Sequence, residues 1–237
     1  MLLLNAVKFD PPLKEATFLR RYKRFFADIE TNSGDRLTIH CPNTGKMTGC
    51  DVPDSRIWYS TSTNKNRKLP ETLELVEVNA FTEEVVCVNT HRANQLVAEA
   101  LANQALPPIN DSKPLQREWT EPGVHGRFDF GNAEIVVEVK SVTWNRNGIG
   151  YFPDAPSARA TKHIHGLIHC LTKGKRAILF FCVPHTGVST VDLAKDIDPE
   201  FARVTIEAVR KGLEVYAYRW LLSPREFYLE KPLPLRI

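Results

Sequence analysis

The feature that most constrains the fold is an unbroken apolar run from Ala177 to Val183. A strand without a polar position is buried on both faces, which is typical of a central strand whose sheet carries helices on both sides. Helical patterns flank this run at residues 155–173 and 199–211, and each ends at a glycine. The C-terminal part of the chain therefore predicts an α/β layout around a mixed central sheet.

A further helix is expected over residues 93–106. This segment lacks glycine and proline, repeats its apolar residues at helical spacing, and stops at Pro107-Pro108. Strands are expected at residues 117–120, 125–130, 134–142 and 213–220. Helices and strands thus alternate through this part of the chain, as an α/β sheet requires.

Short segments of β pattern fill the N-terminal third. They lie near residues 17–30, 37–41, 56–63, 73–78 and 84–88, with turn sequences such as Asn32-Ser33-Gly34-Asp35 between them. Such punctuation predicts a small barrel or sandwich. A length of ~80–90 residues suits an OB-like barrel, although the pattern does not separate it from an SH3-like one. We therefore expect a barrel over residues 1–85 and an α/β domain over residues 86–237.

Composition narrows the class of protein. Hydrophobic residues make up 43% of the chain and charged residues 25%, as in ordinary globular proteins. The opening apolar run, Met1 to Leu4, is far shorter than a secretory h-region or a spanning helix. We expect a soluble, cytoplasmic protein with no membrane partner. The five cysteines have no C-x-x-C spacing, which favours buried thiols over disulfides or a zinc ribbon.

Contacts with nucleic acid would depend on local clusters, because the net charge is only +3. The barrel part contains two short basic runs, Arg20, Arg21, Lys23 and Arg24, and Lys65, Arg67 and Lys68. Such runs can neutralise DNA phosphates or simply form solvated faces. The loop from Asn43 to Lys46 could hold a phosphate through backbone amides and Lys46, or be a plain turn. Trp144 lies in an Asn-rich segment, so we expect it to be exposed and to stack on a base.

Asp129, Glu138 and Lys140 are the candidates for chemistry. Glu138 and Lys140 are two apart and share one face of an expected strand, and a buried strand rarely carries an acid and a base unless they are paired or used. An Asp and a Glu together form a hard oxygen site for Mg²⁺ or Mn²⁺. A neighbouring lysine can orient a water or stabilise charge at phosphorus. The alternative is a plain Glu–Lys pair at a sheet edge.

The expected hairpin raises one geometric difficulty. If Gly131-Asn132 is a two-residue turn, Asp129 lies opposite residue 134, and Glu138 is about 13 Å further along the strand. A shared metal site then requires a bulge, a sharp bend or a strong twist.

The helix that follows supports a phosphate ligand. Arg159, Lys162 and His163 are spaced i, i+3 and i+4, so they lie on one helical face. Two cations and a titratable ring on one face suit a phosphate, although a solvated helix side would look the same.

These motifs resemble those of the PD-(D/E)XK nuclease superfamily. Asp129 matches its metal-binding aspartate, and Glu138-Val139-Lys140 matches its E-x-K element. The resemblance implies Mg²⁺ or Mn²⁺ held by Asp129 and Glu138, with Lys140 assisting catalysis. Glu99, on the preceding helix, lies where some members place an additional acid. Related nuclease folds often form homodimers, and the sequence leaves this open.

A closer resemblance runs through nearly the whole chain, to the sugar fermentation stimulation protein family. It is carried by the segments His40 to Met47, Asn66 to Leu69, Val88-Asn89-Thr90 with Asn94, Arg127 to Phe130, Val137 to Thr143, and Phe152 to Ala155 with Arg159 and His163. This resemblance implies an N-terminal OB-like domain, a C-terminal restriction-endonuclease-like domain, largely sequence-nonspecific DNA binding, and a role in regulating sugar utilisation, particularly of maltose.

Three functions remain open on this basis. The first is a DNA-binding protein with a nuclease-like domain, and the second is an active Mg²⁺-dependent nuclease. The third is a small-molecule-binding regulator without DNA affinity. The acid–acid–lysine set has no use in pure binding, which favours nuclease activity over binding alone.

Overall fold

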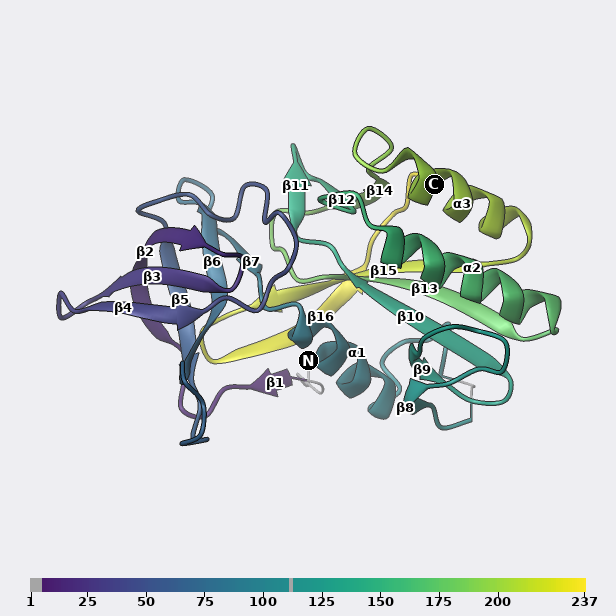
Figure 1. The fold of residues 1–237 in the computed structure, drawn as a ribbon, viewed down its shortest axis with the longest axis horizontal. Helices are drawn as coiled ribbons and strands as arrows, with labels where there is room; N and C mark the ends of the chain where they lie inside the picture. The colour runs from purple at the N-terminus through teal and green to yellow at the C-terminus, as the bar shows by residue number, and fades with distance from the viewer. Residues whose placement is uncertain (1–5, 111–112) are drawn as a thin grey trace.

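The computed structural model describes residues 6–110 and 113–237. Its N-terminal part is a barrel built from antiparallel strands, drawn in purple and blue in Figure 1. The strands are β2 (Lys14–Tyr22), β3 (Phe26–Thr31), β4 (Arg36–His40), β5 (Arg56–Thr61), β6 (Glu71–Asn79) and β7 (Glu84–Cys87). They are ordered β4-β3-β2-β5-β6-β7, and a further pairing of β4 with β6 closes the first five into a barrel. The OB-like expectation is confirmed.

The barrel encloses a core of its own. Phe18, Ile29, Ile39 and Leu73 are all fully buried inside it, because alternate residues of each strand point inward. The segment expected as one strand over residues 17–30 is two strands, β2 and β3, joined by a turn in which Lys23 and Arg24 have φ of 48° and 63°. Tyr22 and Phe26 pair, so the loop has three residues, 23–25, and two consecutive left-handed residues in it reverse the chain tightly.

The C-terminal part is centred on a seven-stranded mixed sheet. Its order is β1-β16-β15-β13-β10-β9-β8. The strands are β1 (Ala6–Lys8), β8 (Gln116–Trp119), β9 (Phe128–Gly131), β10 (Ile135–Ser141), β13 (Arg176–Val183), β15 (Glu214–Leu222) and β16 (Glu226–Pro232). The apolar run forms β13 as expected, with parallel neighbours β10 and β15 on either side.

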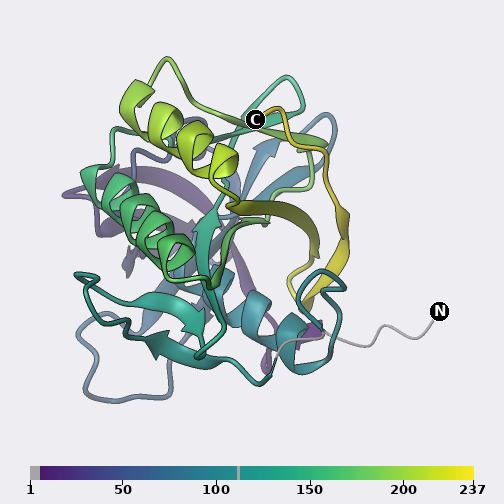
Figure 2. The ribbon, with the colours of Figure 1, turned by 90° about the vertical axis from the view of Figure 1, so that its right-hand side faces the viewer.

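Helices cover both faces of this sheet. In the described chain they are α1 (His91–Ala102), α2 (Ala158–Thr172) and α3 (Pro199–Arg210). Helices α2 and α3 lie side by side on one face, and α1 packs on the other (Figure 2). Ser157 and Asp198 begin α2 and α3 by accepting backbone N–H groups at the helix N-termini. All three expected helices are present, with ends within about four residues of the expected ones.

A small third sheet corrects one expectation. It contains β11 (Trp144–Arg146), β12 (Ile149–Phe152) and β14 (Thr190–Leu193), ordered β11-β12-β14. Trp144 is not an exposed loop residue: it is only 8% exposed, and the Arg146 guanidinium stacks over its ring at 3.8 Å. The ring is therefore not free to stack on a nucleic-acid base.

The barrel and the large sheet are joined by more than one chain connection. Strand β1 precedes the barrel in sequence but pairs with β16 of the large sheet. Strand β7 of the barrel forms an antiparallel bridge from Val86 to His185, and Cys87 N–H donates to Pro184 O at 2.9 Å. The expected domain boundary, with a barrel over residues 1–85 and an α/β domain over residues 86–237, stays a prediction. None of the described helices is long and apolar enough to cross a membrane.

Candidate active site

The turn between β9 and β10 resolves the geometric difficulty of the hairpin. Phe130 pairs with Val137 and Gly131 with Val136, so the connection is longer than two residues. The Asn132 side chain closes it by accepting the N–H groups of Glu134 and Ile135 at 2.8 and 3.0 Å. The two strands pair as far as Phe130–Val137, and beyond that pair the Asp129 side chain accepts the backbone N–H of Val139. Phe128 and Phe130 are two residues apart on β9 but pack in the cores on opposite faces of the sheet, so the regular alternation of β9 is broken around Asp129.

Asp129 bridges three elements. Its Oδ2 accepts the backbone N–H of Val139 at 2.8 Å, and its Oδ1 accepts Asn94 Nδ2 of α1 at 2.6 Å. Burial, with the negative charge of Glu138 in second place, raises the pKa of Asp129 from 3.8 to about 6. Two neighbouring carboxylates that repel each other in this way are typical of a site that binds a cation.

Glu138 lies at the centre of the site and is 2% exposed. Its Oε1 accepts Lys140 Nζ at 2.5 Å and also contacts His163 Nδ1 of α2. Burial opposes the charge, but Lys140 and His163 outweigh it, so the pKa of Glu138 lies below its usual value. The other oxygen, Oε2, is buried and has no hydrogen-bond partner among the described residues.

A cavity of about 690 Å³ opens over these side chains, and both parts of the chain line it. The barrel contributes the loop from Asn43 to Gly45, and the α/β part contributes Asp129, Glu138, Lys140, Arg159 and His163. Arg159 is exposed at the first turn of α2, and its side chain has no partner in the described structure. This cavity is a concave, polar site at the boundary of two domains, where ligand sites commonly lie.

The barrel loop from Asn43 to Lys46 is held by hydrogen bonds inside the protein. These bonds change the expected roles of Arg21 and Asn43. Arg21 donates to the carbonyls of Asn43 (2.6 Å), Gly45 (3.0 Å) and Lys46 (3.3 Å). Asn43 is 3% exposed, and its side chain donates to Val88 O and accepts Gly45 N–H. Their polar groups are engaged inside the protein. Both residues therefore shape the loop instead of offering free donors to a phosphate.

Glu99 does not join the site. It is exposed on α1, where its carboxylate accepts Asn103 Nδ2 at 2.9 Å, and it does not line the cavity. The side chain of α1 that reaches Asp129 is Asn94. The two positions are five residues apart, which turns them about 140° from each other around the helix. Asn94 belongs to the segments that carry the family resemblance. The sequence did not indicate a role for it at the site, because its side chain is an amide and not an acid.

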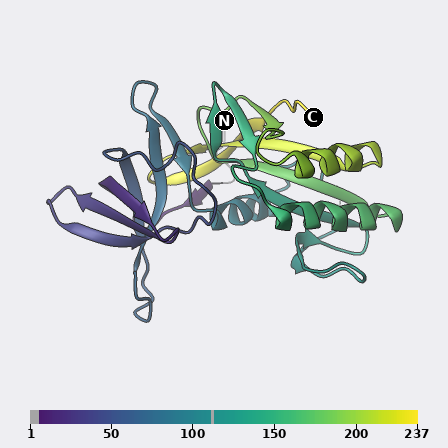
Figure 3. The ribbon, with the colours of Figure 1, turned by 45° about the horizontal axis from the view of Figure 1, so that its top comes forward.

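The remaining basic residues lie on the barrel surface, away from the carboxylates. Arg20 is exposed and paired with Asp28 at 2.7 Å. The others are exposed as well and do not line the carboxylate cavity, namely Lys23, Arg24, Lys46, Lys65, Arg67 and Lys68. The loop that connects β5 to β6, which carries Lys65, Arg67 and Lys68, extends away from the barrel (Figure 3).

The sequence also gave no indication of the role of Asp154, which enters the sequence analysis only within the segment Phe152 to Ala155. Its Oδ2 accepts the backbone N–H of Met47 at 2.9 Å and so ties the barrel loop to the wall of the cavity. A contact between residues so distant in sequence leaves no trace in local patterns.

The residues fit a divalent cation in part. Asp129 and Glu138 supply hard carboxylate oxygens, and the unpartnered, buried Glu138 Oε2 lacks the hydrogen bond that a buried polar atom normally has. Among residues 6–110 and 113–237, no group of three or more His, Cys, Asp or Glu side chains is placed to hold a metal. Mg²⁺ commonly uses only one or two carboxylates and keeps several waters, so this donor set suits it.

Comparison with known proteins agrees with this architecture. Residues 19–88 match the model of the SfsA N-terminal OB domain, and residues 91–226 match that of the sugar fermentation stimulation protein RE domain. A solved structure of SfsA from Pyrococcus furiosus in complex with Ca²⁺ has a TM-score of 0.87 and 24% sequence identity, covering 100% of both chains. At this identity the likeness shows the fold. Because the second family model alone spans more than half of the sequence, the chain belongs to the sugar fermentation stimulation protein family.

Proposed function

We propose that this protein binds DNA without strong sequence preference and hydrolyses its phosphodiester bonds with a divalent metal ion. The observation that carries the proposal is that Asp129 and Glu138 line one cavity, close enough for the charge of Glu138 to raise the pKa of Asp129, with Lys140 beside them. Acid, acid and lysine at one site have a shared use in phosphodiester hydrolysis, whereas a binding surface alone gains nothing from two buried carboxylates.

Asp129 and Glu138 would hold Mg²⁺ or Mn²⁺, Glu138 through its unpartnered Oε2. The Pyrococcus furiosus relative was solved with Ca²⁺, a hard cation that takes oxygen ligands as Mg²⁺ does. When bound, such an ion lowers the pKa of a coordinated water and polarises a phosphoryl oxygen.

The other residues of the site prepare it for an anionic substrate. Lys140 Nζ, 2.5 Å from Glu138 Oε1, can orient a water or donate to an oxygen on which charge develops. His163 fixes the same Glu138 oxygen and so leaves Oε2 directed elsewhere. Arg159, exposed at the edge of the cavity, can neutralise the phosphate of the substrate.

Binding to the DNA backbone would involve the exposed cations of the barrel. They are Arg20, Lys23, Arg24, Lys46, Lys65, Arg67 and Lys68. Phosphate contacts of this type carry no sequence information and weaken steeply with salt. Regulation of sugar-utilisation genes, to which the family name refers, would act through the same contacts.

The test is cleavage of single-stranded, duplex and branched DNA and of RNA with Mg²⁺ or Mn²⁺, with binding measured in parallel at two salt concentrations. Wild type is compared with Glu138→Gln and with the matched control Glu99→Gln, an acid on the surface of α1 outside the cavity. We expect metal-dependent cleavage that Glu138→Gln abolishes and Glu99→Gln retains, with DNA bound by all three. Salt-sensitive binding without cleavage by wild type would leave a DNA-binding module. No DNA affinity at any salt would favour a small-molecule regulator.

A further inference from the structure

A second cavity, of about 610 Å³, lies at another part of the boundary between barrel and α/β domain. Its lining comes from the segment after β1, from β2, from the loop between β5 and β6, and from the start of α1. The positively charged or titratable side chains in it are Lys8, Lys14, His40, Arg67, His91 and Arg92. The cavity does not contain Asp129, Glu138 or Lys140.

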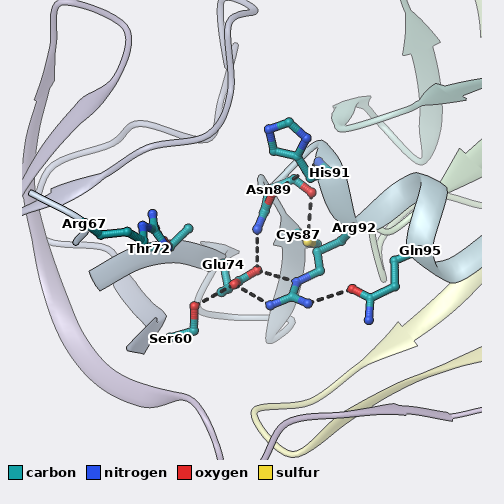
Figure 4. Close-up of polar contacts among 9 residues, drawn as sticks. All are labelled: Ser60, Arg67, Thr72, Glu74, Cys87, Asn89, His91, Arg92 and Gln95. Carbon is teal, nitrogen blue, oxygen red and sulfur yellow. Dashed lines mark hydrogen bonds and ion pairs between the residues drawn. The ribbon is translucent and has the colours of Figure 1, made fainter. Parts of the chain in front are cut away.

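The cavity holds more positive than negative charge. Glu74 is 1% exposed, but Arg92 donates to both of its oxygens at 2.9 and 2.7 Å, and Ser60 and Asn89 complete its hydrogen bonds (Figure 4). The carboxylate is thus neutralised and has no free oxygen directed into the cavity. Asp10 is the other acid of the lining. The lining contains three further cations, Lys8, Lys14 and Arg67, so their positive charge exceeds the negative charge of Asp10.

Several of the lining groups lack a partner that would satisfy them. His40 Nδ1 is buried without a hydrogen bond in the described chain. The His91 ring is exposed at the N-terminus of α1, and no side-chain bond holds it within the described residues. Burial, and then the positive charges of Arg67 and His91, lower the pKa of His40. Positive charges gathered around polar groups without partners are an environment in which a bound anion is stabilised.

The shape of the cavity indicates more than a simple ion. Its volume lies within the range of ordinary ligand sites and exceeds what one inorganic phosphate needs. Phe9, Pro11 and Pro12 add apolar surface to a lining that also contains the cations and the hydroxyls of Ser62 and Thr63. A nucleotide combines these features, with a phosphate for the cations and a sugar or base for the apolar surface.

The two cavities share a wall. Pro42 and His91 line the second cavity, whereas their chain neighbours Asn43 and Thr90 line the first. Figure 4 shows how Asn89, His91 and Arg92 come from the start of α1 while Arg67 approaches from the barrel. The stretch of chain at the start of α1 therefore separates a site for carboxylate chemistry from a cationic one.

We propose that this second cavity binds the phosphate group of a nucleotide, through Arg67 and His91, at a site separate from the carboxylate site. The nucleotide is either free or one unit of a strand that also crosses the first cavity. The second source rests on the proposed function, whereas the first does not.

The experiment is titration of the full chain with inorganic phosphate, a nucleoside monophosphate and a short single-stranded oligonucleotide, followed by calorimetry. Variants are His91→Gln, whose ring has no partner to lose among the described residues, and Arg67→Gln, which also gives up a 3.0 Å bond to Thr72. Lys173→Gln is the matched control, because Lys173 is an exposed cation that does not line the cavity and is not among the residues proposed to contact the DNA backbone. Circular dichroism verifies that each variant is folded.

We expect His91→Gln and Arg67→Gln to bind the monophosphate about tenfold or more weakly, and Lys173→Gln to bind it as wild type does. If only the oligonucleotide binds and the same two variants weaken it, the phosphate belongs to a strand. The proposal is overturned if wild type binds neither nucleotide form, or if Lys173→Gln loses as much affinity as the cavity variants. Glu138→Gln should keep the site intact, so loss of the proposed hydrolytic function and loss of this site are distinguishable.

Discussion

The Asp154 carboxylate accepts the backbone N–H of Met47 at 2.9 Å across 107 residues of sequence. Met47 belongs to the barrel and is fully buried, and Asp154 belongs to the segment that leads into α2. The bond fixes the barrel loop on the cavity that contains Asp129 and Glu138. Gly45 is in close contact there, since a Cβ on it would lie 2.9 Å from both Asp154 oxygens.

Removing this bond should loosen the loop. We expect Asp154→Ala to lower the free energy of unfolding by about 1–3 kcal/mol, the range for a hydrogen bond to a charged group, and to lower DNA cleavage. Asp154→Asn keeps an acceptor and should cost less. Urea unfolding measures the change. Asp196→Ala, which removes an exposed acid paired with Arg146, is the control and should change stability far less, because solvent screens an exposed ion pair. Equal losses in both alanine variants would contradict an anchoring role for Asp154.

The ion pair between Glu74 and Arg92 should matter more for stability than any surface pair. Glu74→Ala leaves the Arg92 guanidinium, whose side chain is 21% exposed, without its carboxylate. Breaking a buried pair from one side typically costs about 3–5 kcal/mol. Glu200→Ala removes the partner of exposed Arg203 and should cost far less, because solvent screens this pair. Chemical denaturation compares the two, and a loss for Glu74→Ala no larger than the control would show that solvent already screens the pair.

Asp129 should make the metal-free protein less stable as pH rises. Its pKa is about 6 in the fold, against an ordinary value of 3.8, so between these pH values the folded state binds more protons than the unfolded state does. This contribution to stability is present below about pH 4 and lost as pH rises through 6. We expect Asp129→Asn to be more stable than wild type at pH 7, by up to about 3 kcal/mol, and equal to it near pH 4. The measurement is the free energy of unfolding of both proteins between pH 4 and 7. A difference between them that does not change with pH would contradict the raised pKa of Asp129.

A divalent ion at the carboxylate site should stabilise the fold. Thermal unfolding with increasing Mg²⁺ or Mn²⁺ is expected to raise the Tm of wild type, because an ion that binds only the native state adds RT ln(1 + [L]/Kd) to its stability. The increase should vanish in Glu138→Gln and persist in Glu99→Gln. Unchanged metal response in Glu138→Gln would place the ion elsewhere.

Trp144 should act through packing. Trp144→Ala removes a ring that is 8% exposed and covered by Arg146, and large-to-small changes of this kind typically cost about 3–5 kcal/mol. Trp144→Phe should cost less and leave DNA affinity unchanged. Fluorescence-detected unfolding and DNA titration measure both. A loss of affinity in Trp144→Phe at unchanged stability would restore a stacking role.

Local patterns were enough to predict most of the large elements. The apolar run of β13, the helices that flank it and the short strands of the barrel all follow from periodicity and from turn residues. Strand β1 was missed because its three residues form a strand only through pairing with β16. The sheet of β11, β12 and β14 was missed for the same reason, since β12 pairs with β14 some forty residues later in the chain.

The sequence by itself determined which residues are candidates for chemistry: two acids and a lysine at strand spacing, and an arginine and a histidine on one helical face. Only the tertiary structure decided which of them meet. The pairing of β9 with β10 brings the Asp129 side chain to the backbone of Val139, next to Glu138. The turn of α1 directs Asn94 inward and Glu99 outward, and Asp154 holds the barrel loop over the cavity. Register, helix rotation and long-range hydrogen bonds depend on packing between distant segments, and no local pattern records them.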